Sequence, residues 1–200
     1  MATIVIQIVI FFICLSVHEA AHAWSAYRLG DPTAKVEGRM TLNPLAHIDP
    51  YGTFIVPIVL ALIGAPVFGW AKPVSINPRN FAHPARDSFI SALSGPAANI
   101  VFAVVISLVM RLISKNSLPY DILYFFVQVN ITLAIFNLLP IPPLDGSKVW
   151  YLFLSEESAL TLERFGPVIL IAVLLFSSTA NNVLLRFIGT ISQFVVGIIS

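Results

Sequence analysis

Charged residues are scarce in this chain, and their scarcity restricts what the protein can be. Asp, Glu, Lys and Arg make up 10% of the 200 residues, whereas hydrophobic residues make up 58%. Soluble domains carry about 25% charged residues, so a chain this apolar cannot cover its surface in water. The composition therefore excludes a soluble globular protein, a disordered chain and a nucleic-acid binder that works through a basic patch.

Cysteine is almost absent as well. Cys14 is the single cysteine, and it lies within an apolar run. One cysteine forms no disulfide within the chain and cannot build a cysteine-based zinc site alone. We therefore interpret Cys14 as a small buried hydrophobic residue.

Long apolar runs predict that the protein spans a lipid bilayer, because a spanning helix needs about 20 predominantly apolar residues. A shorter apolar stretch, Phe54–Trp70, contains two prolines and two glycines, which favour a broken or re-entrant segment. The link Ala180–Asn182 predicts a hairpin between the last two candidate spans. The five long candidates are Thr3–Leu29, Phe89–Met110, Leu118–Leu139, Phe165–Thr179 and Val183–Ile199.

These runs define the expected fold class. The chain is predicted to be an all-α polytopic membrane protein with five to six transmembrane helices and a re-entrant or broken segment around residues 54–70. No appended soluble domain is recognisable, so residues 1–200 are expected to form a single membrane-embedded domain.

The first predicted span carries an HExxH motif, His18-Glu19-Ala20-Ala21-His22. Side chains at positions i and i+4 lie on the same face of a helix, so both imidazoles can bind one zinc ion. The intervening Glu19 is then placed to act as a general base. A polar cluster that is merely hydrogen-bonded inside a helix bundle is the alternative, but a metal site explains all three residues together.

A catalytic zinc site normally has a third protein ligand, and Asp145 is the candidate. It follows the Leu118–Leu139 span and the proline-rich run 140–143, which breaks the helix and exposes backbone. Gly146 permits a tight turn beside it. A solvated turn after the helix remains an equal alternative on position alone.

Two further segments carry polar residues that need an interpretation. In Ser94-Gly95-Pro96-Ala97-Ala98-Asn99, the small residues suit close helix packing, whereas the Asn99 amide needs a partner and could support the site. His47 and Asp49 either bind metal or line the site entrance, or they form a structural turn, which is the favoured interpretation.

Three motifs in order, HEAAH, SGPAAN and FNLLPIPPLDG, make the chain resemble the site-2 protease family of intramembrane zinc metalloproteases, in its compact branch without PDZ or CBS domains. The resemblance implies that His18, His22 and Asp145 bind one Zn²⁺ per chain and that Glu19 is the catalytic base. It also implies that Asn137 helps to hold the substrate or the oxyanion.

The expected function is hydrolysis of peptide bonds in or near transmembrane segments of membrane proteins, with the bilayer and a transmembrane substrate as partners. The substrate would have to unwind, and residues 36–50 and 70–76 are candidate edges for pairing with it as a strand. A metal transporter and a catalytically inactive scaffold that binds membrane helices are the alternatives. Intramembrane carboxylates are otherwise rare here, which disfavours a transport path.

The basic residues predict an orientation. The HExxH motif and Asp145 can share one zinc ion only if the first and third long spans end on the same side. This predicts that Phe54–Trp70 is re-entrant, or that another part of residues 30–87 returns through the membrane and cancels its crossing. The re-entrant arrangement places eight Lys and Arg on the side of the site and three opposite, whereas a full crossing gives six and five. By the positive-inside rule, the site is expected nearer the cytoplasmic side of the cell membrane.

Overall fold

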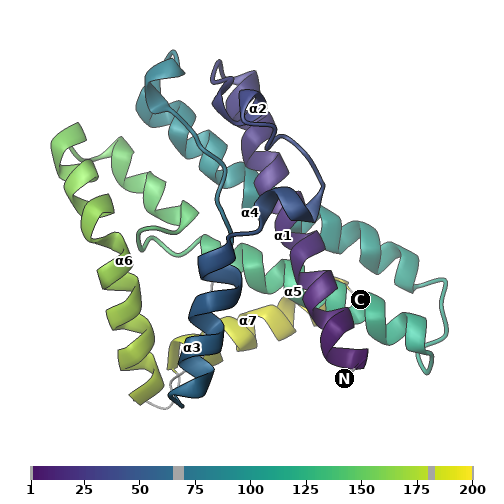
Figure 1. Ribbon diagram of the computed structural model, residues 1–200. Helices are drawn as coiled ribbons and strands as arrows, with labels where there is room; N and C mark the ends of the chain where they lie inside the picture. The colour runs from purple at the N-terminus through teal and green to yellow at the C-terminus, as the bar shows by residue number, and fades with distance from the viewer. Residues whose placement is uncertain (1, 65–69, 180–182, 200) are drawn as a thin grey trace.

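The computed structural model describes residues 2–64, 70–179 and 183–199 (Figure 1). These residues are predominantly helical and include no β-strand, so the predicted all-α class is confirmed. Four short helical turns separate the longer elements: η1 (Pro44–His47), η2 (Pro50–Ile55), η3 (Pro78–Asn80) and η4 (Asp145–Leu152). The α-helices are α1 (Ala2–Arg28), α2 (Thr33–Val36), α3 (Val56–Leu62), α4 (Pro84–Met110), α5 (Leu118–Asn137), α6 (Glu156–Thr179) and α7 (Val183–Ile199).

Among the described residues, three helices are long and apolar enough to cross a membrane: Val5–Arg28, Pro84–Met110 and Leu118–Asn137. They correspond to the first three predicted spans. Helix α4 begins before the predicted Phe89 because its first turn has favourable chemistry, with Pro84 at the start and Asp87 near the helix N-terminus. The last two predicted spans lie within α6 and α7, and the link Ala180–Asn182 is outside the described residues.

Helices α1, α4 and α5 contact one another and form the centre of the fold, and α7 packs on α5 (Figure 1). Helix α6 lies to one side, where it contacts η4 and α7. In lipid, helix association depends on close packing rather than on escape from water. The buried core cluster comes from α4, α5 and α7 and consists of Ala103, Ile106, Met110, Val127, Ile131 and Val196.

The end of α1 is fixed by a glycine cap and a buried carboxylate. Gly30 adopts φ 109°, and the Asp31 N–H donates to the Ala26 carbonyl at 2.9 Å, as in a Schellman cap. The fully buried Asp31 side chain accepts hydrogen bonds from Thr33, from Asn80 and from the Asn77 N–H. Burial raises the pKa of Asp31, but these hydrogen bonds outweigh it and hold the pKa below its usual value.

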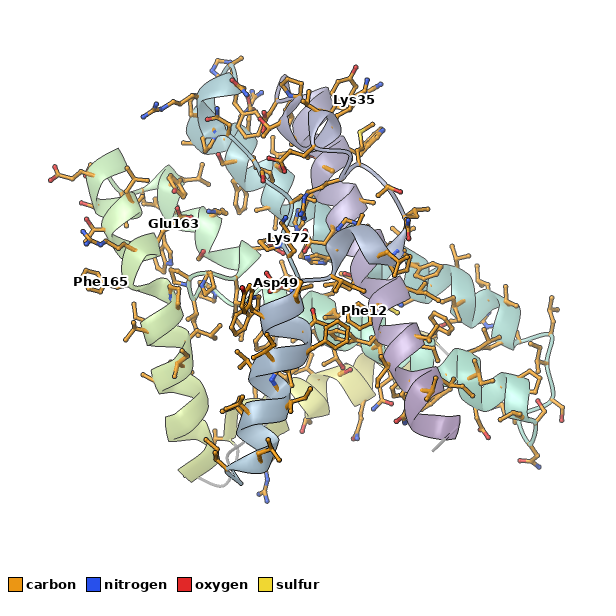
Figure 2. The ribbon with its side chains drawn as sticks, in the orientation of Figure 1. Phe12, Lys35, Asp49, Lys72, Glu163 and Phe165 are labelled. Carbon is orange, nitrogen blue, oxygen red and sulfur yellow. The ribbon has the colours of Figure 1, made fainter. Side chains whose placement is uncertain are left out.

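The segment predicted to be broken leaves the helix core and returns to its starting point. The Trp70 N–H donates to the Gly52 carbonyl at 3.1 Å, and the Thr53 hydroxyl donates to the Trp70 carbonyl at 3.2 Å. Between them lie the π-type turn η2, the short helix α3 and a turn; residues 65–69 are outside the described residues. Asp49 and Lys72 are labelled in Figure 2, and the Lys72 N–H donates to the carbonyl of His47, two residues before Asp49, at 2.9 Å.

Residues 70–77, which we call the strap, form neither helix nor strand and run back toward α4 as an elongated segment (Figure 1). The buried Arg39 donates to two consecutive strap carbonyls, at 3.3 Å each. Asp31 accepts the Asn77 N–H at 2.7 Å at the far end of the strap. Because extended backbone has no internal hydrogen bonds, these contacts with the α1–α3 region place the strap beside α1.

Candidate metal centre

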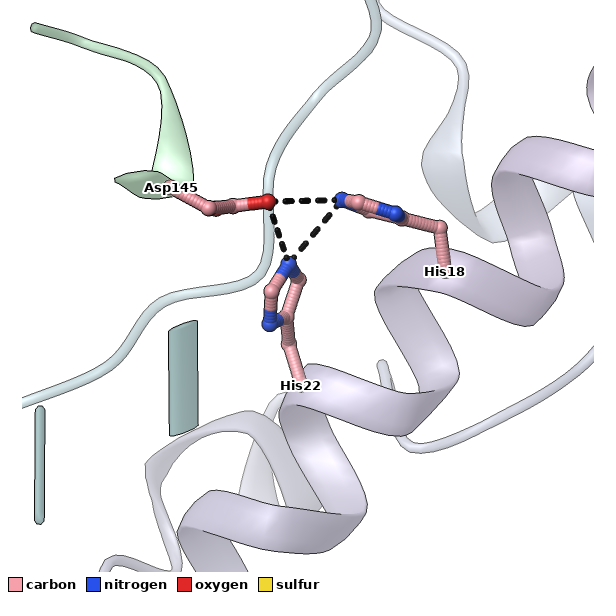
Figure 3. A group of neighbouring side chains, drawn as sticks. All are labelled: His18, His22 and Asp145. Atoms are coloured by element: carbon pink, nitrogen blue, oxygen red, sulfur yellow. Dashed lines mark hydrogen bonds and ion pairs between the residues drawn. The ribbon is translucent and has the colours of Figure 1, made fainter. Parts of the chain in front are cut away.

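His18, His22 and Asp145 converge on one point (Figure 3). The two Nε2 atoms are 3.0 Å apart, and they lie 3.0 Å (His18) and 3.2 Å (His22) from Asp145 Oδ2. Zinc bonds of about 2.0–2.1 Å in a tetrahedral site place ligand atoms about 3.3 Å apart. The three atoms therefore have nearly the spacing that one zinc ion requires.

The hydrogen bonds behind the imidazoles fix the orientation of both rings. His22 Nδ1 lies 2.8 Å from the Ser91 carbonyl oxygen, an acceptor only, so this nitrogen carries the proton. His18 Nδ1 lies 2.6 Å from Asn99 Oδ1. Both Nε2 atoms consequently face each other and the Asp145 carboxylate, an arrangement that a cation at its centre would stabilise. The residues therefore fit a bound zinc ion.

Glu19 lies on the same helix but outside this triangle of ligand atoms. The residue is 8% exposed, and its Oε2 accepts the Val74 N–H of the strap at 2.9 Å. Glu19 directly follows His18 in α1, and its carboxylate is bonded to the strap backbone. The contact also shows why the strap matters to the site: it supplies the donor that holds Glu19.

Comparison with known proteins agrees with this geometry. Residues 112–180 match the family model "Peptidase family M50". YwhC of Bacillus subtilis, named as a zinc metalloprotease, is 38% identical over 74% of this chain and 68% of its own. Rip2 of Mycobacterium tuberculosis H37Rv, named likewise, is 30% identical over 86% of this chain and 67% of its own. The chain belongs to the site-2 protease family.

Other relatives extend the comparison. The zinc metalloprotease MJ0392 of Methanocaldococcus jannaschii is 25% identical over 78% of this chain and 45% of its own. The chain thus spans about two thirds of YwhC and Rip2 and less than half of MJ0392. No solved structure matches it significantly. By its family, this chain is classed as a zinc metalloprotease. How its residues are arranged around the candidate metal centre follows from the local geometry.

Gly146 allows this metalloprotease to bring Asp145 to the histidines. A Cβ atom added at Gly146 would lie 2.2 Å from the backbone oxygen of Leu138, at the end of α5. The turn is closed by the Ser147 N–H and hydroxyl, which donate to the Leu144 carbonyl at 3.0 and 2.6 Å. The tight turn expected from the sequence is therefore present, and its reason is close approach to α5.

Gly95 has a more specific place than helix packing alone. A Cβ atom there would lie 2.4 Å from His22 Nε2 and 2.8 Å from His18 Cε1, so α4 presents bare backbone to both imidazoles. On the sequence alone, Gly95 is expected on a helix-packing face. The position of the SGPAAN motif in a predicted helix does not indicate which side chains Gly95 contacts.

We expect Gly95→Ala to weaken zinc binding about tenfold or more, because the new methyl group must displace the His22 ring. Titration of the purified apoprotein against a zinc chelator measures this. Gly189→Ala is the matched control, since a Cβ there meets nothing within 4 Å. Equal zinc affinity in the Gly95 variant would show that the imidazoles do not need this space.

The remaining sequence-predicted residues, Asn137, His47 and Asp49, make their hydrogen bonds with other parts of the chain. Asn137 donates to the Leu133 carbonyl of its own helix at 3.0 Å, and its substrate role stays a prediction. His47 Nε2 lies 3.0 Å from the Thr41 carbonyl. Asp49 caps η2 by accepting two backbone N–H bonds at 2.8 Å. The contacts of His47 and Asp49 are those of a structural turn.

Proposed function

We propose that this chain is an intramembrane zinc metalloprotease that hydrolyses peptide bonds in or near transmembrane segments of membrane proteins. The observation that carries the proposal is the convergence of His18, His22 and Asp145 next to Glu19, on helices long and apolar enough to lie in a bilayer. The helices surround one site, which supports treating residues 1–200 as a single domain.

In this proposal, His18, His22 and Asp145 hold one zinc ion per chain. Zinc supplies Lewis-acid chemistry: it polarises a carbonyl group and makes water a better nucleophile. Glu19 removes a proton from the attacking water and returns it to the leaving amine, so it acts first as base and then as acid. Its hydrogen bond from Val74 keeps the carboxylate beside the histidines during both transfers.

The substrate is proposed to be a transmembrane protein whose helix unwinds locally before cleavage. Pairing with the strap is one way to hold the unwound segment. The N–H groups of Trp70, Lys72 and Val74 already donate to other parts of this chain. Because alternate residues of an extended segment face the same side, an incoming strand would have to use the opposite edge of the strap.

A metal transporter and an inactive scaffold are the competing functions. Quantitative proteomics of membranes from cells with the native chain and with Glu19→Gln separates them. We expect intact substrate proteins to accumulate with Glu19→Gln and their cleaved products to be absent. Identical membrane proteomes would contradict proteolysis, because transport and scaffolding do not require a general base.

The placement of the site is also a proposal: an integral protein of the cell membrane, with zinc nearer the cytoplasm. The meeting of Gly52 and Trp70 supports a re-entrant segment that does not cross, and hence five spans rather than six. In that arrangement, eight basic residues lie on the side of the site and three on the other.

Single cysteines at the exposed positions Lys35, Arg79 and Lys115, in a Cys14→Ala background, test this topology. We expect an impermeant thiol reagent applied to intact cells to label position 115 and to spare positions 35 and 79. Permeabilised cells should show labelling at all three. Labelling of position 79 from outside, with position 35 protected, would contradict the re-entrant segment.

A further inference from the structure

Behind His18, two buried amides link three helices. Asn99 of α4 contacts His18 and Cys14 of α1, and Asn130 of α5 contacts Asn99. The side chains of Asn99, Asn130 and Cys14 have no solvent exposure. Polar groups buried in an apolar helix bundle are costly unless every donor is satisfied. Such a network therefore calls for an explanation beyond packing.

The orientation of each amide follows from a backbone carbonyl beside it, because a carbonyl oxygen accepts hydrogen bonds and cannot donate them. Asn130 Nδ2 lies 2.8 Å from the Phe126 carbonyl and 3.0 Å from Cys14 Sγ, so Asn130 Oδ1 must face Asn99. Asn99 Nδ2 then donates to Asn130 Oδ1 at 2.7 Å and to the Cys14 carbonyl at 3.1 Å. All four amide hydrogens of the two side chains are used.

The orientation of the Asn99 amide determines which ring nitrogen of His18 carries the proton. With its nitrogen committed to Asn130 and Cys14, Asn99 can offer only oxygen to His18 Nδ1. Nδ1 must therefore carry the ring proton, which leaves the Nε2 lone pair directed at His22 and Asp145. A flipped Asn99 would place its oxygen against the Cys14 carbonyl and its NH₂ group against His18.

We propose that Asn130 is a positioning residue of the metal centre: through Asn99, it holds His18 in the tautomer and orientation that bind zinc. The inference rests on the proposed metal role of His18. Residues that orient a metal ligand typically change metal affinity by about 10–100-fold when they are lost. Asn130 is a residue that the sequence analysis did not single out, because its link to His18 passes through another helix.

If Asn130 had only a structural role, its replacement should affect the protein no differently from the replacement of another polar residue between helices. Thr132, two residues further along α5, also makes a polar contact between helices, with Ser192 of α7 at 3.0 Å. Within the described part of the chain, that pair makes no hydrogen bond with the histidines. Removing either polar group should loosen helix packing to a similar degree. Only the loss of Asn130 should also change the orientation of the zinc ligand His18.

Zinc affinity of the purified chain, measured by competition with a fluorescent chelator, separates the two roles. We expect Asn130→Leu to weaken zinc binding about 10–100-fold and Thr132→Val to leave it within about twofold of native. The double variant Asn99→Leu/Asn130→Leu should bind no more weakly than Asn99→Leu alone, because Asn130 acts through Asn99. Thermal unfolding of the apoproteins provides the measure of structural loss.

Native zinc affinity in Asn130→Leu, or additive losses in the double variant, would overturn the inference. If Asn130→Leu does not fold, Asn130→Ser takes its place, since the shorter hydroxyl withdraws from Asn99 and the same loss is expected. A native chain that binds no zinc would instead contradict the proposed function itself. The two failures are therefore distinguishable.

Discussion

Glu19→Gln is expected to slow peptide hydrolysis by about 10²–10⁴-fold while the chain keeps its zinc. The glutamine amide has nearly the size of the carboxylate, and its oxygen can still accept the Val74 N–H, so the local structure should persist. It cannot accept the proton of an attacking water at neutral pH. Because general bases contribute about 10²–10⁴-fold to such reactions, we expect a loss of that size in the cleavage rate.

The measurement is cleavage of a transmembrane substrate by purified protein, with zinc content determined on the same samples. Glu37→Gln is a suitable control, because Glu37 also contacts the strap, through the Ser75 hydroxyl at 2.8 Å, but is exposed. This control should retain native activity. Cleavage by Glu19→Gln at a near-native rate would remove Glu19 from the mechanism.

Loss of a zinc ligand is expected to have the second large effect. His22→Ala removes one of three converging donor atoms, and Asp145→Ala removes the only carboxylate oxygen in the triangle. We expect either change to weaken zinc binding by more than about hundredfold, beyond the range typical of residues that only orient a ligand. Peptide hydrolysis should fall with zinc occupancy.

Metal analysis and chelator competition on the purified variants provide the readout. Asp121→Ala is the matched control for Asp145→Ala, since Asp121 is an exposed carboxylate in the first turn of α5. It should bind zinc as the native chain does. Full zinc occupancy in Asp145→Ala would exclude Asp145 as a ligand and reopen the search for the third one.

The features of the fold and site that depend on local periodicity could be predicted from the sequence. The i, i+4 spacing placed His18 and His22 on one face of a helix, and apolar length located α1, α4 and α5. The prolines and glycines in residues 54–70 indicated a break, and the structure adds the contact that closes it. Asp145 was a candidate by position, and the fold brings its oxygen to the imidazoles.

Contacts between distant segments could not be predicted in the same way. The Val74 N–H that holds Glu19, the close approach of Gly95 to the two imidazoles and the link from Asn130 to His18 each join parts of the chain far apart in sequence. The residue types at these positions do not indicate which partner each residue contacts. They become visible only when α1, α4, α5 and the strap are placed together.

X-ray absorption at the zinc edge of the purified native chain tests the central claim most directly. We predict one zinc per chain, with two imidazole nitrogens and one carboxylate oxygen at about 2.0–2.2 Å, and loss of this signal in His22→Ala. A zinc shell that contains sulfur, or an unchanged spectrum in His22→Ala, would contradict the assignment of His18, His22 and Asp145 as the metal centre.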